Sequence, residues 1–116
     1  MSAEHTLTLI KPDALEKDVM GEIISRFEEN DLRPVAMRMV HLTEDEAKDF
    51  YSVHEDKPFF GELVEFMTRG PIVAAVLEGE NAIERTRSVM GATDPDDAEP
   101  GTIRADFATD VGENSV

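Results

Sequence analysis

Three cations occupy positions where a solvated surface charge is not the natural interpretation. Lys11 follows the apolar run 6–10 and precedes Pro12, so its ammonium is expected at the C-terminal end of a strand, a common place for a ligand. Arg87 falls on the apolar stripe of a helix-like segment, and Arg104 follows a proline-punctuated acidic loop. Each cation alone is more often a surface charge or, for Arg104, an ion pair with that loop. Together they match phosphate recognition, which uses planar arginine forks and a compact lysine.

An aromatic segment offers a second kind of contact. In the segment 57–67, Pro58 is expected at the first position of a helix, and Phe59 stands beside it at the rim. The expected core stripe of this helix consists of Phe60, Leu63, Val64 and Met67. Phe59 could stack on a flat ring, although spacing alone equally allows it to cover the edge of the core. An aromatic side chain combined with three cations indicates a nucleotide site.

Composition sets limits on the class of protein. A chain of 116 residues without cysteine suits one domain, 1–116, that folds without disulfides. No apolar run approaches the roughly 20 residues needed to span a bilayer, and the N-terminus does not resemble a secretory signal, so a cytoplasmic protein is expected. The net charge of −15 and the lack of a basic patch make nucleic-acid binding unlikely. The same charge fits a high-salt, halophilic cytosol, or simply an ordinary acidic protein.

The elements that would position these residues follow from hydrophobic periodicity. Strands are expected at 6–10, 35–40 and 72–77, and the last of these, an unbroken apolar run, should be central and covered on both faces. Helices are expected near 20–30, 58–67 and 81–90. Thr43 and Glu46 form a capping box that opens a short helix with Ala47, Phe50 and Tyr51 directed inward. The order predicts an α+β, ferredoxin-like βαββαβ antiparallel sheet with covering helices, whose fourth strand is cut short by the chain end.

Six sequence segments carry a resemblance to a known family. They are Thr8–Asp13 (TLIKPD), Gly21–Ile24 (GEII), Lys57–Phe60 (KPFF), Gly70–Val73 (GPIV), Gly91–Pro95 (GATDP) and Pro100–Phe107 (PGTIRADF). In order and spacing the chain resembles the nucleoside diphosphate kinases from end to end. The resemblance implies transfer of a phosphoryl group between nucleoside tri- and diphosphates by a ping-pong mechanism, with Mg²⁺ held through the nucleotide phosphates and no metal site in the protein. It also implies a homo-hexamer or a tetramer built from dimers.

The resemblance assigns a role to each matching residue. Phosphate contacts fall to Lys11, Arg87, Thr93 and Arg104, and Lys11 also steadies the charge on the transferring group. The base is expected to stack on Phe59, with Leu63 and Val111 bracketing it. Asn114 is expected to bind the sugar and phosphate region, and Tyr51 to orient the catalytic histidine.

That histidine is the one departure from the family pattern. The family places it directly after the segment that ends here at Val116, and His5, His41 and His54 are not expected to replace it. We therefore expect the C-terminal part of the domain to be absent from these 116 residues, which should be inactive alone. The alternative is a catalytically silent nucleotide-binding or assembly module.

Overall fold

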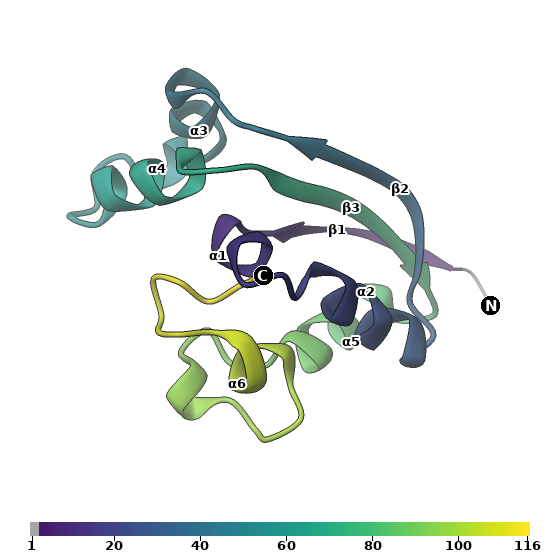
Figure 1. The fold of residues 1–116 in the computed structure, drawn as a ribbon. Coiled ribbons are helices and arrows are strands. Elements are labelled where there is room, and N and C mark those ends of the chain that lie inside the picture. Colours follow the sequence, from purple (N-terminus) through teal and green to yellow (C-terminus); the bar gives the residue numbers. More distant parts are fainter. Residues whose placement is uncertain (1–2) are drawn as a thin grey trace.

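The computed structural model describes residues 3–116, which form an α+β fold (Figure 1). The elements are β1 (Glu4–Ile10), α1 (Pro12–Glu16), α2 (Met20–Glu29), β2 (Arg33–Val40), α3 (Glu44–Phe50), the 3₁₀ turn η1 (Ser52–His54), α4 (Phe60–Thr68), β3 (Ile72–Gly79), α5 (Ala82–Met90), the 3₁₀ turn η2 (Pro95–Asp97) and α6 (Ile103–Phe107). None of the helices in this part of the chain is long and apolar enough to cross a membrane.

The sheet has the strand order β1-β3-β2, and both pairs are antiparallel. The prediction that 72–77 forms the central strand is confirmed, because β3 pairs on both edges. Residues 108–116, where a shortened fourth strand was expected, form no strand in the described chain. They are attached beside β1 by a backbone hydrogen bond of 2.9 Å from the Lys11 amide to the Ser115 carbonyl.

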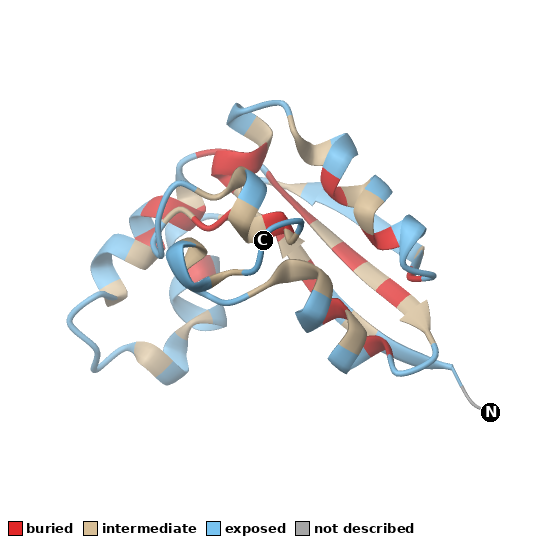
Figure 2. Ribbon diagram, turned by 90° about the horizontal axis from the view of Figure 1, so that it is seen from below, coloured by how far each residue is buried: buried red, intermediate tan, exposed pale blue. Residues whose placement is uncertain are grey.

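Two hydrophobic clusters lie on opposite faces of the sheet. Val73 belongs to the main core with Phe27 of α2 and Ala82 of α5. Its neighbour Ile72 belongs to a second cluster with Met67 of α4. Adjacent strand residues point to opposite faces, so α2 and α5 cover one face while α4 covers part of the other. Figure 2 shows the resulting alternation of buried and partly buried positions along β3.

The expectation that β3 is covered on both faces is correct only near its beginning. Further along, Leu7 of β1 lies opposite Val76 and is 53% exposed. The unbroken apolar run 72–77 correctly predicted a central strand. It could not show that the second face loses its helical cover after the first residues, since α3 and α4 gather at one end of the sheet (Figure 1).

Local sequence signals correctly predicted the start of α3 but not the start of α4. The capping box is confirmed: the Glu46 amide donates to Thr43 Oγ1 at 3.2 Å, and the Thr43 amide donates to Glu46 Oε1 at 2.9 Å. Ala47 is buried as expected, whereas Phe50 is 52% exposed, so its expected inward direction is wrong.

The predicted start of the fourth helix is also wrong. Pro58 does not occupy the first helical position, because the Phe60 amide donates to the Lys57 carbonyl at 3.1 Å and closes a turn with Pro58 at its second position. Proline suits both positions through its fixed φ, so its presence alone does not distinguish them. The helix itself begins at Phe60 with Phe59 as its N-cap.

Polar contacts join the C-terminal third of the chain to α2. Arg26 of α2 pairs with Asp106 of α6 at 2.6 Å, and its guanidinium lies 4.8 Å from the centre of the Phe107 ring. The Thr102 side chain caps α6 by accepting from the Ala105 amide at 3.3 Å. These contacts hold α6 below α2 (Figure 1). Arg104, which α6 carries, donates to the Val116 carbonyl.

Candidate active site

A cleft of about 660 Å³ lies between the end of β1, helix α4 and the loop 109–113. It brings together five residues singled out in the sequence, which come from four separate segments: Lys11, Phe59, Leu63, Thr93 and Val111. These five offer a cation, a hydroxyl and three apolar side chains. A cleft with one charged end and one apolar end suits a ligand with the same division.

Lys11 lines the cleft, and Arg104, which lies outside the lining, is near enough to lower the pKa of Lys11. The Lys11 ammonium donates to Asn114 Oδ1 at 2.7 Å. The Arg104 guanidinium donates to the Gly91 carbonyl at 3.1 Å and to the Val116 carbonyl at 2.7 Å, while its Nε is buried without a partner in the described chain. Among residues 3–116 neither cation forms an ion pair with an acid, so the alternative that Arg104 pairs with the acidic loop is wrong. Both charges are left available to an anion.

The electrostatic state of Lys11 reflects this arrangement. Burial, reinforced by the nearby positive charge of Arg104 and only partly offset by Asp13, lowers the pKa of Lys11 from its ordinary 10.5 to about 8. Burial also lowers the pKa of Arg104. Two partly desolvated cations that repel each other are a costly arrangement without a ligand. A bound polyanion would relieve the repulsion and the loss of hydration together.

The apolar end of the cleft lies at the start of α4. Phe59 is 47% exposed, and its ring centre is 5.7 Å from that of His54. Leu63 is half-buried one turn further along α4, and Val111 on the opposite loop is largely exposed. An exposed aromatic ring and two aliphatic side chains around an open cleft can accept a flat heterocycle by stacking.

Four of the residues singled out in the sequence do not line this cleft: Arg104, described above, and Asn114, Tyr51 and Arg87. Asn114 is buried behind it and connects Lys11 to the Thr93 carbonyl, to which its Nδ2 donates at 3.4 Å. Tyr51 is half-buried in the cluster under α4, with its ring centre 4.8 Å from that of Phe50, and burial raises the pKa of its hydroxyl. Arg87 is exposed on α5.

The placement of Arg87 corrects the expected face of its helix. The buried residues of α5 are Ala82 and Thr86, with Val89 partly buried. Ile83, expected on the buried stripe with Arg87, is 50% exposed. The sequence allows either of two adjacent stripes of α5 to face the core. In the structure, the stripe with Ala82 packs against β1, and the stripe with Ile83 and Arg87 faces solvent. Arg87 therefore extends from α5 into solvent, one turn before Gly91.

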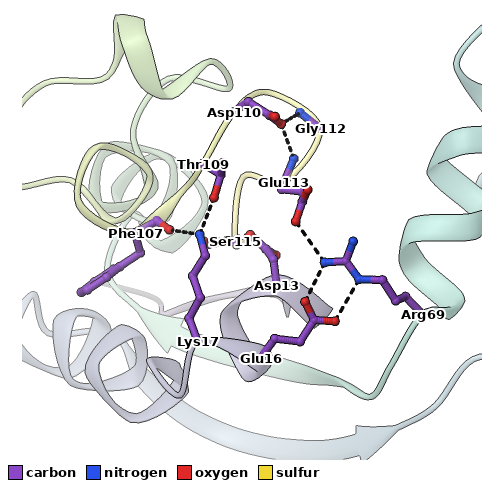
Figure 3. A network of polar contacts seen from close by, with 10 residues as sticks. All are labelled: Asp13, Glu16, Lys17, Arg69, Phe107, Thr109, Asp110, Gly112, Glu113 and Ser115. Carbon is purple, nitrogen blue, oxygen red and sulfur yellow. Dashed lines mark hydrogen bonds and ion pairs between the residues drawn. The ribbon is translucent and has the colours of Figure 1, made fainter.

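An ion-pair network beside the cleft was not anticipated from the sequence. Arg69 at the end of α4 binds Glu16 of α1 through two hydrogen bonds of 2.9 and 2.7 Å, and also binds Glu113 at 3.0 Å (Figure 3). Asp110 accepts from the amides of Gly112 and Glu113 and so shapes the loop that carries Val111. The partners are far apart in the chain, so no local spacing could have indicated them.

The acidic side chains near the cleft do not form a metal cage. Among residues 3–116, no group of three or more histidine, cysteine, aspartate or glutamate side chains is placed to hold a metal ion. Four acids line the cleft, Glu62, Glu65, Asp110 and Glu113, and Glu113 is engaged by Arg69. The donors present suit a metal that enters with a phosphate ligand and keeps part of its water shell.

Comparison with known proteins identifies the family of the chain. The family model for nucleoside diphosphate kinase matches residues 4–116. A nucleoside diphosphate kinase of Anaeromyxobacter sp. (strain K) is 59% identical over the whole chain, which covers 79% of that relative's length. The crystal structure of the Aquifex aeolicus nucleoside diphosphate kinase is 49% identical, with a TM-score of 0.95 over 98% of this chain and 83% of that one.

A third comparison concerns a ligand complex. The structure of a halophilic nucleoside diphosphate kinase from Halobacterium salinarum in complex with CDP is 44% identical, with a TM-score of 0.93 over 97% of this chain and 74% of that one. These matches confirm the ferredoxin-like fold and extend over nearly the whole described chain. The chain therefore belongs to the nucleoside diphosphate kinase family, phosphotransferase enzymes that act on nucleotides, need a divalent metal and assemble into oligomers.

Proposed function

We propose that this protein transfers the γ-phosphoryl group of a nucleoside triphosphate to a nucleoside diphosphate, through a phosphohistidine intermediate, and that the cleft beside α4 is its nucleotide site. The observation that carries the proposal is the pair of neighbouring cations, Lys11 in the wall of the cleft and Arg104 close to it, whose side-chain partners are amide and carbonyl oxygens. Phosphate oxygens would supply the negative charge that these residues lack.

In this proposal the phosphates enter the charged end of the cleft. Lys11 acts as a compact positive charge against the transferring group, and Arg104 presents its planar fork to the phosphate oxygens. The Thr93 hydroxyl, which lines the same cleft, supplies a neutral donor. Arg87 extends from the surface of α5 and closes over the phosphates from outside. Such groups stabilise the loose, charge-rich transition state of phosphoryl transfer mainly through position and charge.

The base is proposed to lie against Phe59, with Leu63 and Val111 on either side of it. Stacking is worth roughly 1–3 kcal/mol per base and is insensitive to base identity, because every base has a flat face. A site of this kind accepts all common nucleotides, as the enzyme's substrates require. The Halobacterium salinarum relative was solved in complex with CDP, which supports nucleotide binding by this chain. Asn114 is proposed to contact the sugar and phosphate region in addition to holding Lys11.

The proposed chemical steps form a ping-pong cycle. A neutral histidine nitrogen attacks the γ-phosphorus of the donor, the bond from phosphorus to the bridging oxygen breaks, and the nucleoside diphosphate leaves with that electron pair. A terminal oxygen of an acceptor diphosphate then attacks the phosphohistidine and restores the imidazole. We propose that this histidine follows Val116, whose carbonyl accepts from Arg104, so that the nucleophile would stand beside the cations. Tyr51 is proposed to orient it.

The divalent metal of the family is proposed to be Mg²⁺. When bound to the phosphates, it neutralises charge on the oxygens next to the transferred group. Lys11 and Arg104 also neutralise negative charge on the phosphates, and the cleft leaves room for a hydrated ion. We also propose a homo-hexamer or a tetramer of dimers and a cytoplasmic location. The net charge of −15 fits a halophilic origin.

Labelling with a γ-labelled triphosphate tests the proposed function. The purified protein is expected to show an intact mass above the 12.9 kDa of these residues and to acquire an acid-labile label. Peptide mapping should place that label on a histidine other than His5, His41 and His54. A chain of greater mass that binds nucleotide but never labels would instead establish the alternative, a silent nucleotide-binding or assembly module.

A further inference from the structure

We propose that Asp13 is a positioning residue for nucleotide phosphate binding, acting through Ser115 on the segment that holds Lys11. The inference rests on the proposed nucleotide site and assigns no contact between Asp13 and the ligand. Its basis is a closed chain of contacts from Asp13 to Ser115, to Asn114 and back to Lys11. No local pattern in the sequence assigns a role to Asp13 or to Ser115.

Asp13 is buried to an unusual degree for a carboxylate. Its side chain belongs to a residue that is 1% exposed, and its one side-chain partner in the described chain is the Ser115 hydroxyl, which donates to Oδ2 at 3.2 Å. Oδ1 is buried without a partner in the same region. The nearby ammonium of Lys17 is directed elsewhere, to the Phe107 carbonyl at 2.8 Å and Thr109 Oγ1 at 2.6 Å (Figure 3). A buried carboxylate with so few side-chain partners costs stability, which makes a role beyond folding a reasonable expectation.

Ser115 is held in place from two sides and in an uncommon conformation. Its φ of 72° lies in the left-handed region, which a non-glycine residue occupies only when its surroundings impose it. Its hydroxyl is bonded to Asp13, and its carbonyl accepts from the Lys11 amide at 2.9 Å. Because the residue is fully buried, neither contact can be replaced by water without a shift of the backbone.

The consequence of this anchoring falls on the preceding residue, Asn114. Asn114 presents its Oδ1 to the Lys11 ammonium at 2.7 Å, so the direction of the Lys11 side chain depends on where residue 114 lies. Loss of the Asp13–Ser115 bond would free the turn at Ser115 and release Asn114. Lys11 would then lose its fixed direction toward the phosphate end of the cleft, while the stacking surface at Phe59 would remain intact.

The experiment measures the gain in affinity that the phosphates provide. The dissociation constants of ADP and adenosine are compared in the full-length protein and in Ser115→Ala, Ser115→Gly, Asp13→Ala and Asp13→Asn. Ser115→Gly removes the hydroxyl while easing the left-handed backbone, so it preserves folding if Ser115→Ala does not. Asp13→Asn keeps an acceptor for the hydroxyl and serves as the conservative rescue. Ser88→Ala, which removes an exposed hydroxyl bonded to the Glu84 carbonyl, is the matched control.

In both Ser115 variants and in Asp13→Ala, the affinity for ADP relative to adenosine is expected to fall about tenfold, while the dissociation constant of adenosine stays unchanged. In Asp13→Asn and Ser88→Ala the same ratio is expected to stay within about twofold of the unmodified protein. An unchanged ratio in folded Ser115→Gly would overturn the positioning role and leave the proposed function standing. Equal losses for ADP and adenosine would also overturn it, since they indicate a general structural effect. Absence of any ADP advantage in the unmodified protein would overturn both proposals.

Discussion

Nucleotide binding is expected to drive a proton onto Lys11 in mildly alkaline solution. In the free protein, burial and the charge of Arg104 lower the pKa of Lys11 from 10.5 to about 8. At about 1.4 kcal/mol per pKa unit, this corresponds to about 3 kcal/mol against the charged form. A bound phosphate would reverse the disadvantage by supplying a counter-charge, so the pKa of Lys11 in the complex should return toward its ordinary range.

The size of the effect follows from this pKa. At about pH 8.5, roughly a quarter of the free protein carries the Lys11 proton, so binding of ADP should take up about 0.7 proton. At about pH 7 the uptake should fall to about 0.1 proton. The apparent dissociation constant should weaken about tenfold between about pH 7 and pH 9. Calorimetric titration in buffers of different ionisation enthalpy measures the uptake directly.

Two variants control for other titrating groups. Lys11→Met keeps the length of the side chain without its charge and should abolish the uptake. Lys11→Arg keeps a charge at every accessible pH and should abolish the pH dependence while retaining part of the affinity. An uptake near zero at about pH 8.5 in the unmodified protein, or one that persists in Lys11→Met, would refute the reasoning.

The same pKa fixes the sign of an effect on stability. Because the folded-state pKa of Lys11 lies below the unfolded one, the unfolded chain binds more protons between about pH 8 and 10.5. The contribution of Lys11 to the free energy of unfolding therefore rises with pH through that window and is unfavourable below it. Denaturant titrations of the unmodified protein and Lys11→Met, compared across the window, isolate this contribution.

Four further substitutions have expected outcomes. Phe59→Ala should weaken binding of all nucleoside diphosphates alike, by roughly 1–3 kcal/mol in calorimetric titrations, and a loss confined to one base would contradict the stacking account. Arg104→Ala should weaken ADP binding about tenfold or more. It should also lower the free energy of unfolding by about 1–3 kcal/mol, because two hydrogen bonds to backbone carbonyls are lost. Unchanged ADP affinity would mean that Arg104 only binds those carbonyls. Gly91→Ala should destabilise the fold by about 1–3 kcal/mol in chemical denaturation, because φ is 89° and the new Cβ would lie 2.5 Å from Thr102 Oγ1. Gly101→Ala, with a φ of 90° but open space around it, should cost less, and equal costs would argue against the clash.

Local signals in the sequence were sufficient for several elements. The capping residues Thr43 and Glu46 can be recognised from four consecutive positions, and the structure confirms their reciprocal bonds. The helix expected near 20–30 forms as Met20–Glu29, and the apolar run 72–77 forms the central strand Ile72–Gly79. In each case the deciding interaction lies within the element or follows from its overall hydrophobicity.

Errors arose where a distant contact decides between local alternatives. The turn at Pro58 and a helix start there have the same local preference, and the two possible stripes of α5 differ only in what they pack against. The motif residues Lys11, Phe59, Leu63, Thr93 and Val111 line one cleft in the structure. The Arg69 network and the Asp13–Ser115 bond join residues 44 to 102 positions apart, so periodicity could not indicate them.

A crystal structure with bound ADP tests the central claim most directly. The account predicts phosphate density within hydrogen-bonding distance of Lys11 and Arg104, with the base stacked on Phe59. Nucleotide density elsewhere, for example in the polar groove of about 410 Å³ lined by Glu28, Arg33 and Glu78, would contradict it.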